Sequence, residues 1–302
     1  MQGPIRVHLV DGTYELYRQH FGAPSRDASP NAATVGALQS TLRLFQDGAT
    51  HLAVATDHVI ESFRNELYPG YKTSEGMEPE LLRQIPLLED ALRAMGVTVW
   101  ATVREEADDA LASGVKVALA EPRVAQVRLL TPDKDLAQCV RGRRVIQVDR
   151  RNGAEIDEEG VREKYGVGPA SIPDYLALVG DSSDGFPGLP GWGAKSASAV
   201  LARYRHVEAV PDDHERWAAD GVAVRGAAKL AATLRDGRGE AALFKRLATL
   251  VETVEVGALE DWRWRGPTAA FPDVARDLGA DGVAERAVRL AEEPPTDGGS
   301  AG

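Results

Sequence analysis

Two aspartates and a glycine-rich turn lie close together in the stretch 176–201, and both could do chemistry. Asp181 and Asp184 are three residues apart, so on a helical turn their carboxylates lie on one face. Carboxylate oxygens without histidine or cysteine partners favour a hard divalent cation such as Mg²⁺ or Mn²⁺. We therefore predict that this pair binds a metal ion.

The turn that follows contains three glycines and leads into a helix that is predicted from Ala194. Such a turn exposes backbone N–H groups to which the helix dipole attracts an anion, and a lysine adds positive charge. It is not a Walker A loop, because Ala194 separates the last glycine from the lysine. An ordinary turn between two helices stays an alternative. The residues predicted to hold a phosphate are Gly188, Gly191, Gly193 and Lys195.

Further acids follow four apolar segments that are typical of buried strands, at residues 5–10, 51–55, 97–103 and 127–130. The carboxyl ends of parallel strands meet at one edge of a sheet, which is where ligands bind. Acids in the first turn of a helix are also favoured by its dipole, so the run EEADD could serve only as a helix start. The acids at this edge are Asp11, Asp57, Glu106, Asp108, Asp109, Asp133 and Asp135.

Together with Asp181 and Asp184, these residues form a predicted metal site of nine carboxylates. So many negative charges repel one another strongly unless cations lie among them, and the count implies two ions. Two divalent ions about 4 Å apart can activate a water and stabilise the leaving oxygen of a phosphodiester. Lys72, in a polar and irregular segment, is predicted to neutralise charge on the phosphate. The sequence therefore predicts phosphodiester hydrolysis, with Lys72, Asp11 and Asp133 as catalytic residues.

The net charge of the 302 residues is −11, whereas proteins that bind nucleic acids usually have a basic surplus. The nine acids of the predicted site account for most of this charge. Two local surpluses stand against it: 141–151 holds five arginines, and 225–246 holds six lysines and arginines. They are candidate contacts to a DNA backbone, or simply solvated faces.

The sequence contains no apolar run long enough to cross a membrane, and its start does not have the pattern of a signal peptide. With Cys139 as the single cysteine, no intramolecular disulfide can form, which fits a reducing compartment. We therefore expect a monomeric cytoplasmic protein without membrane contact.

Strand and helix patterns alternate up to about residue 167, which predicts an α/β domain with a parallel sheet and helices on both faces. Helical periods dominate after that point, although VETVEV at 251–256 predicts a short strand. We therefore expect a nuclease domain at 1–168 and a mostly helical domain at 169–290. The tail 291–302 has few apolar residues and is expected to be disordered.

Five blocks of the sequence resemble the flap endonuclease-like 5′ nucleases, the family of the 5′→3′ exonuclease domain of bacterial DNA polymerase I. They stand in the family's order over about residues 5–205 and read LVDGTYELYR, ATDHVIESFRNELYPGYK, EADDALA, LLTPDKDLAQ and DYLALVGDSSDGFPGLPGWGAKSA. The resemblance implies a PIN-like (resolvase-like) nuclease domain followed by a helix-three-turn-helix DNA-binding domain. It also implies two-metal cleavage of DNA at 5′ ends, 5′ flaps or nicks, in DNA replication or repair.

The resemblance also assigns roles to single residues. The family's metal ligands fall on the nine acids named above, and the lysine of its helical arch falls on Lys72. Arg64 and Tyr71 of the same segment are expected to contact DNA with it. The family's duplex-binding turn falls on 188–195, where backbone carbonyls are expected to hold K⁺.

Two positions depart from the family pattern. A second basic residue usually follows the arch lysine, whereas Glu75 stands there, and residues 60–93 hold seven acids against four lysines and arginines. His58 follows Asp57 where the family favours glycine. Because no polymerase domain fits within 302 residues, we expect a free-standing nuclease.

Three other functions share part of this pattern. A haloacid-dehalogenase phosphatase needs an aspartate two residues before Asp11, where Leu9 stands. A PIN-type ribonuclease shares the acids but lacks the glycine turn. A non-catalytic DNA-binding relative is expected to have lost acids, and none is missing; cleavage of DNA distinguishes it from a nuclease.

Overall fold

The computed structural model describes residues 4–22 and 29–292. The sheet has six strands in the order β3-β2-β1-β4-β5-β6. β2 pairs in parallel with β1 and β3, whereas β5 and β6 are antiparallel. The strands are β1 (Ile5–Asp11), β2 (His51–Asp57), β3 (Thr98–Thr102), β4 (Val124–Leu130), β5 (Val145–Asp149) and β6 (Ala154–Ile156). The predicted α/β fold with a mostly parallel sheet is confirmed.

The chain divides into two compact units that interleave along the sequence. Unit 1 comprises Met1–Val59, Glu75–Arg128 and Val254–Gly302; unit 2 comprises Ile60–Ser74 and Leu129–Thr253. The predicted boundary at residue 168 separates two domains that are each continuous in sequence, and it stays a prediction. Residues 291–292 of the predicted disordered tail are helical, and the rest of the tail, from residue 293 onward, lies outside the described residues. Within 4–22 and 29–292, no helix has the length and apolarity to cross a membrane.

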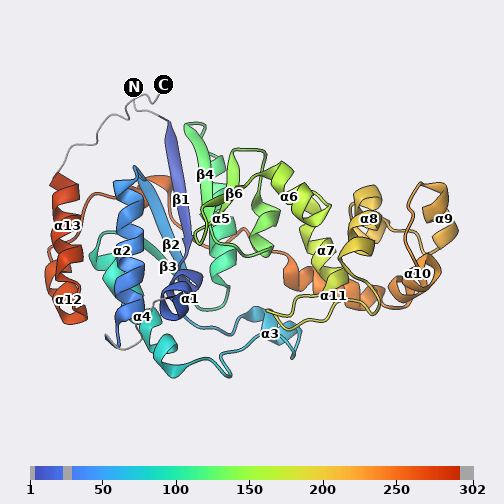
Figure 1. Cartoon of the computed structure of the whole chain (residues 1–302), viewed down its shortest axis with the longest axis horizontal. Helices are drawn as coiled ribbons and strands as arrows, with labels where there is room; N and C mark the ends of the chain where they lie inside the picture. Colours follow the sequence, from blue (N-terminus) through green and yellow to red (C-terminus); the bar gives the residue numbers. More distant parts are fainter. Residues whose placement is uncertain (1–3, 23–28, 293–302) are drawn as a thin grey trace. The chain divides into compact units, whose positions relative to one another are not determined.

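Unit 1 has helices on both faces of its strands (Figure 1). Leu9 and Val10 point to opposite faces because successive side chains of a strand alternate. A Cβ on Gly114 of α5 would meet Trp100 and Leu9, and one on Gly12 at the start of α1 would meet the side chain of Val54, which pairs with Val10. The two helices therefore cover different faces. The helices of unit 1 are α1 (Gly12–Gly22), α2 (Ala32–Gln46), α4 (Pro79–Ala94), α5 (Ala107–Leu119), α12 (Phe271–Leu278) and α13 (Asp281–Glu292).

The predicted strand at 251–256 is wrong, because this segment is irregular. In unit 1 the backbone N–H of Val254 donates to Ser113 Oγ over 2.9 Å. The carbonyl of Val256 accepts a hydrogen bond from Trp262 Nε1 over 2.8 Å. Side chains thus provide partners for this backbone in place of a neighbouring strand.

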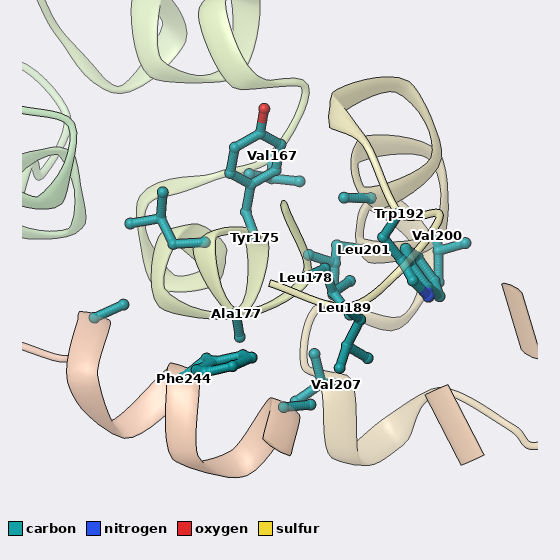
Figure 2. Close-up of a cluster of buried hydrophobic side chains, with 14 of the residues drawn as sticks. Val167, Tyr175, Ala177, Leu178, Leu189, Trp192, Val200, Leu201, Val207 and Phe244 are labelled. Carbon is teal, nitrogen blue, oxygen red and sulfur yellow. The ribbon is translucent and has the colours of Figure 1, made fainter. Parts of the chain in front are cut away.

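Unit 2 is mostly helical and has its own apolar core. Figure 2 shows side chains from α7, α8 and α11 gathered in one cluster, among them Leu178, Leu201 and Phe244. Phe186 stacks on Phe244 with ring centroids 5.7 Å apart. The helices of unit 2 are α3 (Phe63–Leu67), α6 (Glu158–Tyr165), α7 (Ile172–Val179), α8 (Ala194–Tyr204), α9 (His214–Ala219), α10 (Ala227–Asp236) and α11 (Arg238–Ala248), and the 3₁₀ turns are η1 (Asp135–Cys139), η2 (Pro169–Ser171) and η3 (Val207–Ala209).

Candidate active site

Asp11 and Asp57 of unit 1 lie at the carboxyl ends of the neighbouring parallel strands β1 and β2, as the sequence predicts. Asp11 is buried, and its Oδ1 accepts the backbone N–H of Tyr14 over 2.8 Å. Asp57 Oδ1 accepts the N–H of Ala107 at the start of α5, also over 2.8 Å. Each aspartate therefore joins the end of its strand to the beginning of a helix.

Glu106, Asp108 and Asp109 lie at the N-terminus of α5, where the helix dipole favours negative charge. Asp109 is fully buried, and its Oδ2 accepts the N–H of Glu106 over 2.9 Å. Asp109 thus has a capping role, which is the alternative that the sequence left open for this run. The capping bond uses one of its two oxygens.

His58, which follows Asp57, contacts the buried carboxylate of Glu89 on α4. His58 Nδ1 lies 2.9 Å from Glu89 Oε2, and Thr56 Oγ1 donates to Glu89 Oε1 over 2.7 Å. The residues on both sides of Asp57 are thereby anchored to one side chain.

In unit 2, Asp181 and Asp184 lie on a tight loop after α7 and not on the helical turn assumed from their spacing. Gly180 ends the helix with a φ of +82°, and a Cβ there would lie 2.4 Å from the backbone of Pro187. Asp181 and Phe186 then close the loop with two backbone hydrogen bonds of 2.8 and 3.0 Å. The loop nevertheless brings the two carboxylates together.

Within the described part of the chain, one set of three acids has ligand oxygens that all lie within 4.8 Å of one another. The set consists of Asp135, Asp181 and Asp184, and all three side chains are buried. Asp133 adjoins it, because its Oδ1 accepts the N–H of Asp135 over 2.9 Å. Asp135 Oδ1 is buried without a hydrogen-bond partner. A buried, unsatisfied carboxylate oxygen beside other carboxylates is suited to a cation.

Two ammonium groups lie against this cluster. Lys72 Nζ is 3.0 Å from Asp184 Oδ1, and Lys134 Nζ is 2.7 Å from Asp181 Oδ1. Burial, with repulsion from neighbouring carboxylates, raises the pKa of Asp133 and of Asp135. Burial alone would lower the pKa of Lys134, but its bond to Asp181 and the other acids raise it. The sequence reasoning missed Lys134, although its position between two of the predicted ligands was a signal.

Lys72 is held on the aspartate loop through its backbone as well. Its N–H donates to the carbonyl of Asp184 over 2.9 Å, and its own carbonyl accepts Asn65 Nδ2 over 2.9 Å. Gly185 makes this approach possible, because a Cβ at that position would lie 2.2 Å from the carbonyl oxygen of Gly70. The backbone of Lys72 is therefore fixed beside Asp184 in unit 2.

The expectation that Arg64 and Tyr71 contact DNA does not fit their positions. Arg64 is 1% exposed, and its guanidinium donates to the carbonyls of Leu247 (2.7 Å) and Thr249 (3.3 Å). Tyr71 is 3% exposed, and its ring belongs to the apolar cluster of unit 2. Both side chains are buried inside unit 2 in this structure.

The predicted phosphate-binding turn leads into α8, as expected. Gly188 is buried with a φ of +69°, and Gly191 is exposed with a φ of +84°. Gly193 precedes the helix, and its N–H donates to Ser196 Oγ over 3.1 Å. Lys195, in the first turn, is exposed.

Comparison with known families covers nearly all of the described chain. Residues 6–166 match the 5′-3′ exonuclease N-terminal resolvase-like domain, and residues 167–270 match the 5′-3′ exonuclease C-terminal SAM fold. The chain belongs to the 5′-3′ exonuclease family. The suspected relationship is thereby confirmed.

Relatives of this exonuclease-family chain include DNA polymerase I of Pseudomonas aeruginosa, 35% identical over 261 residues that make up 82% of the chain and 27% of the relative. A 5′-3′ exonuclease of Aquifex aeolicus is 33% identical over 219 residues, 70% of the chain and 74% of the relative. The chain thus spans only about a quarter of the polymerase that it matches.

Solved structures of similar fold include the T5 D15 protein co-crystallised with metal ions, with a TM-score of 0.64 and 18% identity over 95% of this chain and 99% of that one. The catalytic core of Rad2 in complex with a DNA substrate has a TM-score of 0.61 and 15% identity, over 95% and 92% of the two chains. At these identities the likeness shows a shared fold for this member of the exonuclease family.

Proposed function

We propose that the chain is a metal-dependent 5′→3′ exonuclease and flap endonuclease that hydrolyses DNA phosphodiesters. The observation that carries this proposal is the buried set Asp135, Asp181 and Asp184, found in a chain of the 5′-3′ exonuclease family. Two solved structures of similar fold support it: the T5 D15 protein was co-crystallised with metal ions, and the catalytic core of Rad2 is in complex with a DNA substrate.

The donor set of the cluster fits a hard divalent cation. All of its ligand atoms are carboxylate oxygens, which suit Mg²⁺ or Mn²⁺. With Asp133 the cluster has four carboxylates against the ammonium groups of Lys72 and Lys134, so two negative charges are left when all are ionised. One divalent ion would balance them.

We propose two ions and nine ligands, as the sequence predicts. In unit 1 the proposed ligands are Asp11, Asp57, Glu106, Asp108 and Asp109, and in unit 2 they are Asp133, Asp135, Asp181 and Asp184. Two divalent ions, when bound, supply the positive charge that favours attack by water and departure of the leaving oxygen. The ammonium of Lys72, held beside Asp184, neutralises charge on the scissile phosphate.

We further propose that the glycine turn holds duplex DNA, through Gly188, Gly191, Gly193 and Lys195. The exposed backbone at Gly191 and Gly193 and the lysine at the start of α8 suit a phosphate, and K⁺ bound by carbonyls of the turn would strengthen the contact. The proposed substrate is DNA with a 5′ end, a 5′ flap or a nick, cut by a monomer.

The test is cleavage of a labelled 5′-flap DNA and the matching single-stranded and RNA-flap molecules. We expect Mg²⁺-dependent cleavage that is lost in Asp133→Asn, which keeps the shape of the side chain but removes its charge. Asp273→Asn, an exposed aspartate of α12, is the control and should cut at the wild-type rate. Equal cutting by wild type and Asp133→Asn contradicts the site, and binding without cutting identifies a non-catalytic relative.

A further inference from the structure

Lys134 lies between two of the proposed metal ligands, and the backbone around it is fixed. Asp133 Oδ1 accepts the N–H of Asp135 over 2.9 Å, which closes a tight turn about the lysine. The N–H of Asp133 donates to Thr131 Oγ1 over 3.2 Å, and its carbonyl accepts Gln147 Nε2 from β5 over 2.6 Å. The side chain of Lys134 therefore starts from a defined point beside the acids.

The ammonium group of Lys134 contacts a buried carboxylate of the cluster. Lys134 Nζ lies 2.7 Å from Asp181 Oδ1, and Asp181 is 2% exposed. The same oxygen accepts the backbone N–H of Ser183 over 2.8 Å and that of Asp184 over 3.4 Å. One oxygen of Asp181 is thus bound by one charged donor and two neutral ones.

This ammonium group brings to the cluster a positive charge that a metal ion would also supply. The four carboxylates keep two negative charges beside the two lysines, and without Lys134 they would keep three. A divalent ion bound by Asp181 has to share that carboxylate with Lys134. Like charges so close repel each other, and they do so more strongly in a partly buried site than in water. The lysine therefore stabilises the acids but opposes the binding of an ion.

We propose that Lys134 is a built-in counter-ion that competes with a divalent ion for Asp181, which rests on the proposed function. In the metal-free protein its ammonium group offsets the repulsion between the buried carboxylates. A bound ion takes over that role against the repulsion of the lysine. Lys134 contacts a ligand and not the DNA, so it is a positioning residue. It raises the concentration of divalent ions that is needed to fill the site.

The experiment is calorimetric titration of Mn²⁺ into the metal-free protein in the absence of DNA. Lys134→Met removes the charge but keeps the length of the side chain, and it should bind Mn²⁺ at least about 10-fold more tightly than the wild type. Lys134→Arg keeps the charge and should bind with the affinity of the wild type. Lys229→Met, which removes an exposed lysine of α10, is the control and should leave the affinity unchanged. The Mg²⁺ concentration for half-maximal cleavage of the 5′-flap DNA, which needs no metal-free protein, should also fall in Lys134→Met.

Thermal unfolding in EDTA separates competition from a merely structural role. We expect a lower melting temperature for Lys134→Met than for the wild type, because a buried carboxylate loses its cation. Mn²⁺ should then raise the melting temperature of the variant more than that of the wild type. Lower stability in EDTA together with tighter Mn²⁺ binding supports the competition. Unchanged or weaker Mn²⁺ binding by Lys134→Met overturns it while the proposed function stands, and a wild type that binds no Mn²⁺ overturns both.

Discussion

Replacing Arg64 with alanine should destabilise the protein strongly and affect DNA contacts only through folding. The side chain is buried in unit 2 and joins α3 to the end of α11. Its guanidinium donates to the carbonyls of Leu247 and Thr249, which belong to the last turn of α11 and the residue that follows it. It also lies 4.7 Å from the ring centroid of Phe63.

The size of the effect follows from these contacts. A hydrogen bond to a charged group contributes about 1.5–3 kcal/mol, so losing two should cost about 4 kcal/mol in the free energy of unfolding. For a chain of 302 residues that corresponds to a fall of about 6 °C in the melting temperature. Arg64→Lys keeps the charge but not the fork of donors, and should cost about half as much.

Urea unfolding, thermal unfolding and duplex binding of both variants provide the assay. Arg246→Ala is the control, because Arg246 is an exposed arginine of the same helix α11, and it should change stability by less than about 0.5 kcal/mol. The reasoning is refuted if Arg64→Ala costs less than about 1 kcal/mol and instead lowers the salt slope of duplex binding. That result would restore Arg64 as a DNA contact.

Three further outcomes are expected. Without divalent ions, Asp135→Asn should have a higher melting temperature than the wild type at pH 7, because burial raises the pKa of Asp135 and disfavours its ionised form. The difference should shrink as the pH falls and Asp135 of the wild type becomes protonated. A lower melting temperature of the variant at pH 7 contradicts this. Burial lowers the pKa of His51 from 6.5, so the unfolded chain binds a proton at a higher pH than the folded one does. The wild type should therefore lose stability as the pH falls below about 6.5. The urea midpoint of His51→Asn should depend less on pH in this range. Gly185→Ala should lose more stability and more cleavage activity than Gly221→Ala. Both glycines have a positive φ, but only at position 185 would the added Cβ clash, with the backbone of Gly70. Equal losses in the two variants would show that the close approach of Gly185 to Gly70 is unimportant.

The sequence was sufficient to predict the strands that carry Asp11 and Asp57. A strand covered on both faces is rich in apolar and β-branched residues, and β1 and β2 each end at the aspartate that follows such a stretch. The segment 251–256 has an equally strand-like pattern but forms no strand. Its partner at Val254 is a side chain 141 residues away in the sequence, and local pattern contains no information on such a contact.

The residue types of the site were predictable, but their burial was not. Asp181 and Asp184 lie together through a loop closed by Phe186 and not through a helical turn. Arg64 was expected to contact DNA because it lies in the same segment as Lys72. Its carbonyl partners are more than 180 residues away, so the sequence shows the arginine but not the groups that accept its hydrogen bonds.

The distribution of charge between the units resolves the apparent conflict between an acidic chain and a polyanionic substrate. Unit 2 contains 21 acidic and 20 basic residues, so nearly all of the net charge of −11 belongs to unit 1. Four of the acids of unit 2 belong to the candidate metal site, whereas Lys195 and Arg205 are exposed. At physiological salt, charges more than about 8 Å apart are largely screened from one another in solvent. Attraction to a DNA backbone therefore depends on the exposed cations near the phosphates, and the sum over the whole chain is a poor guide to it.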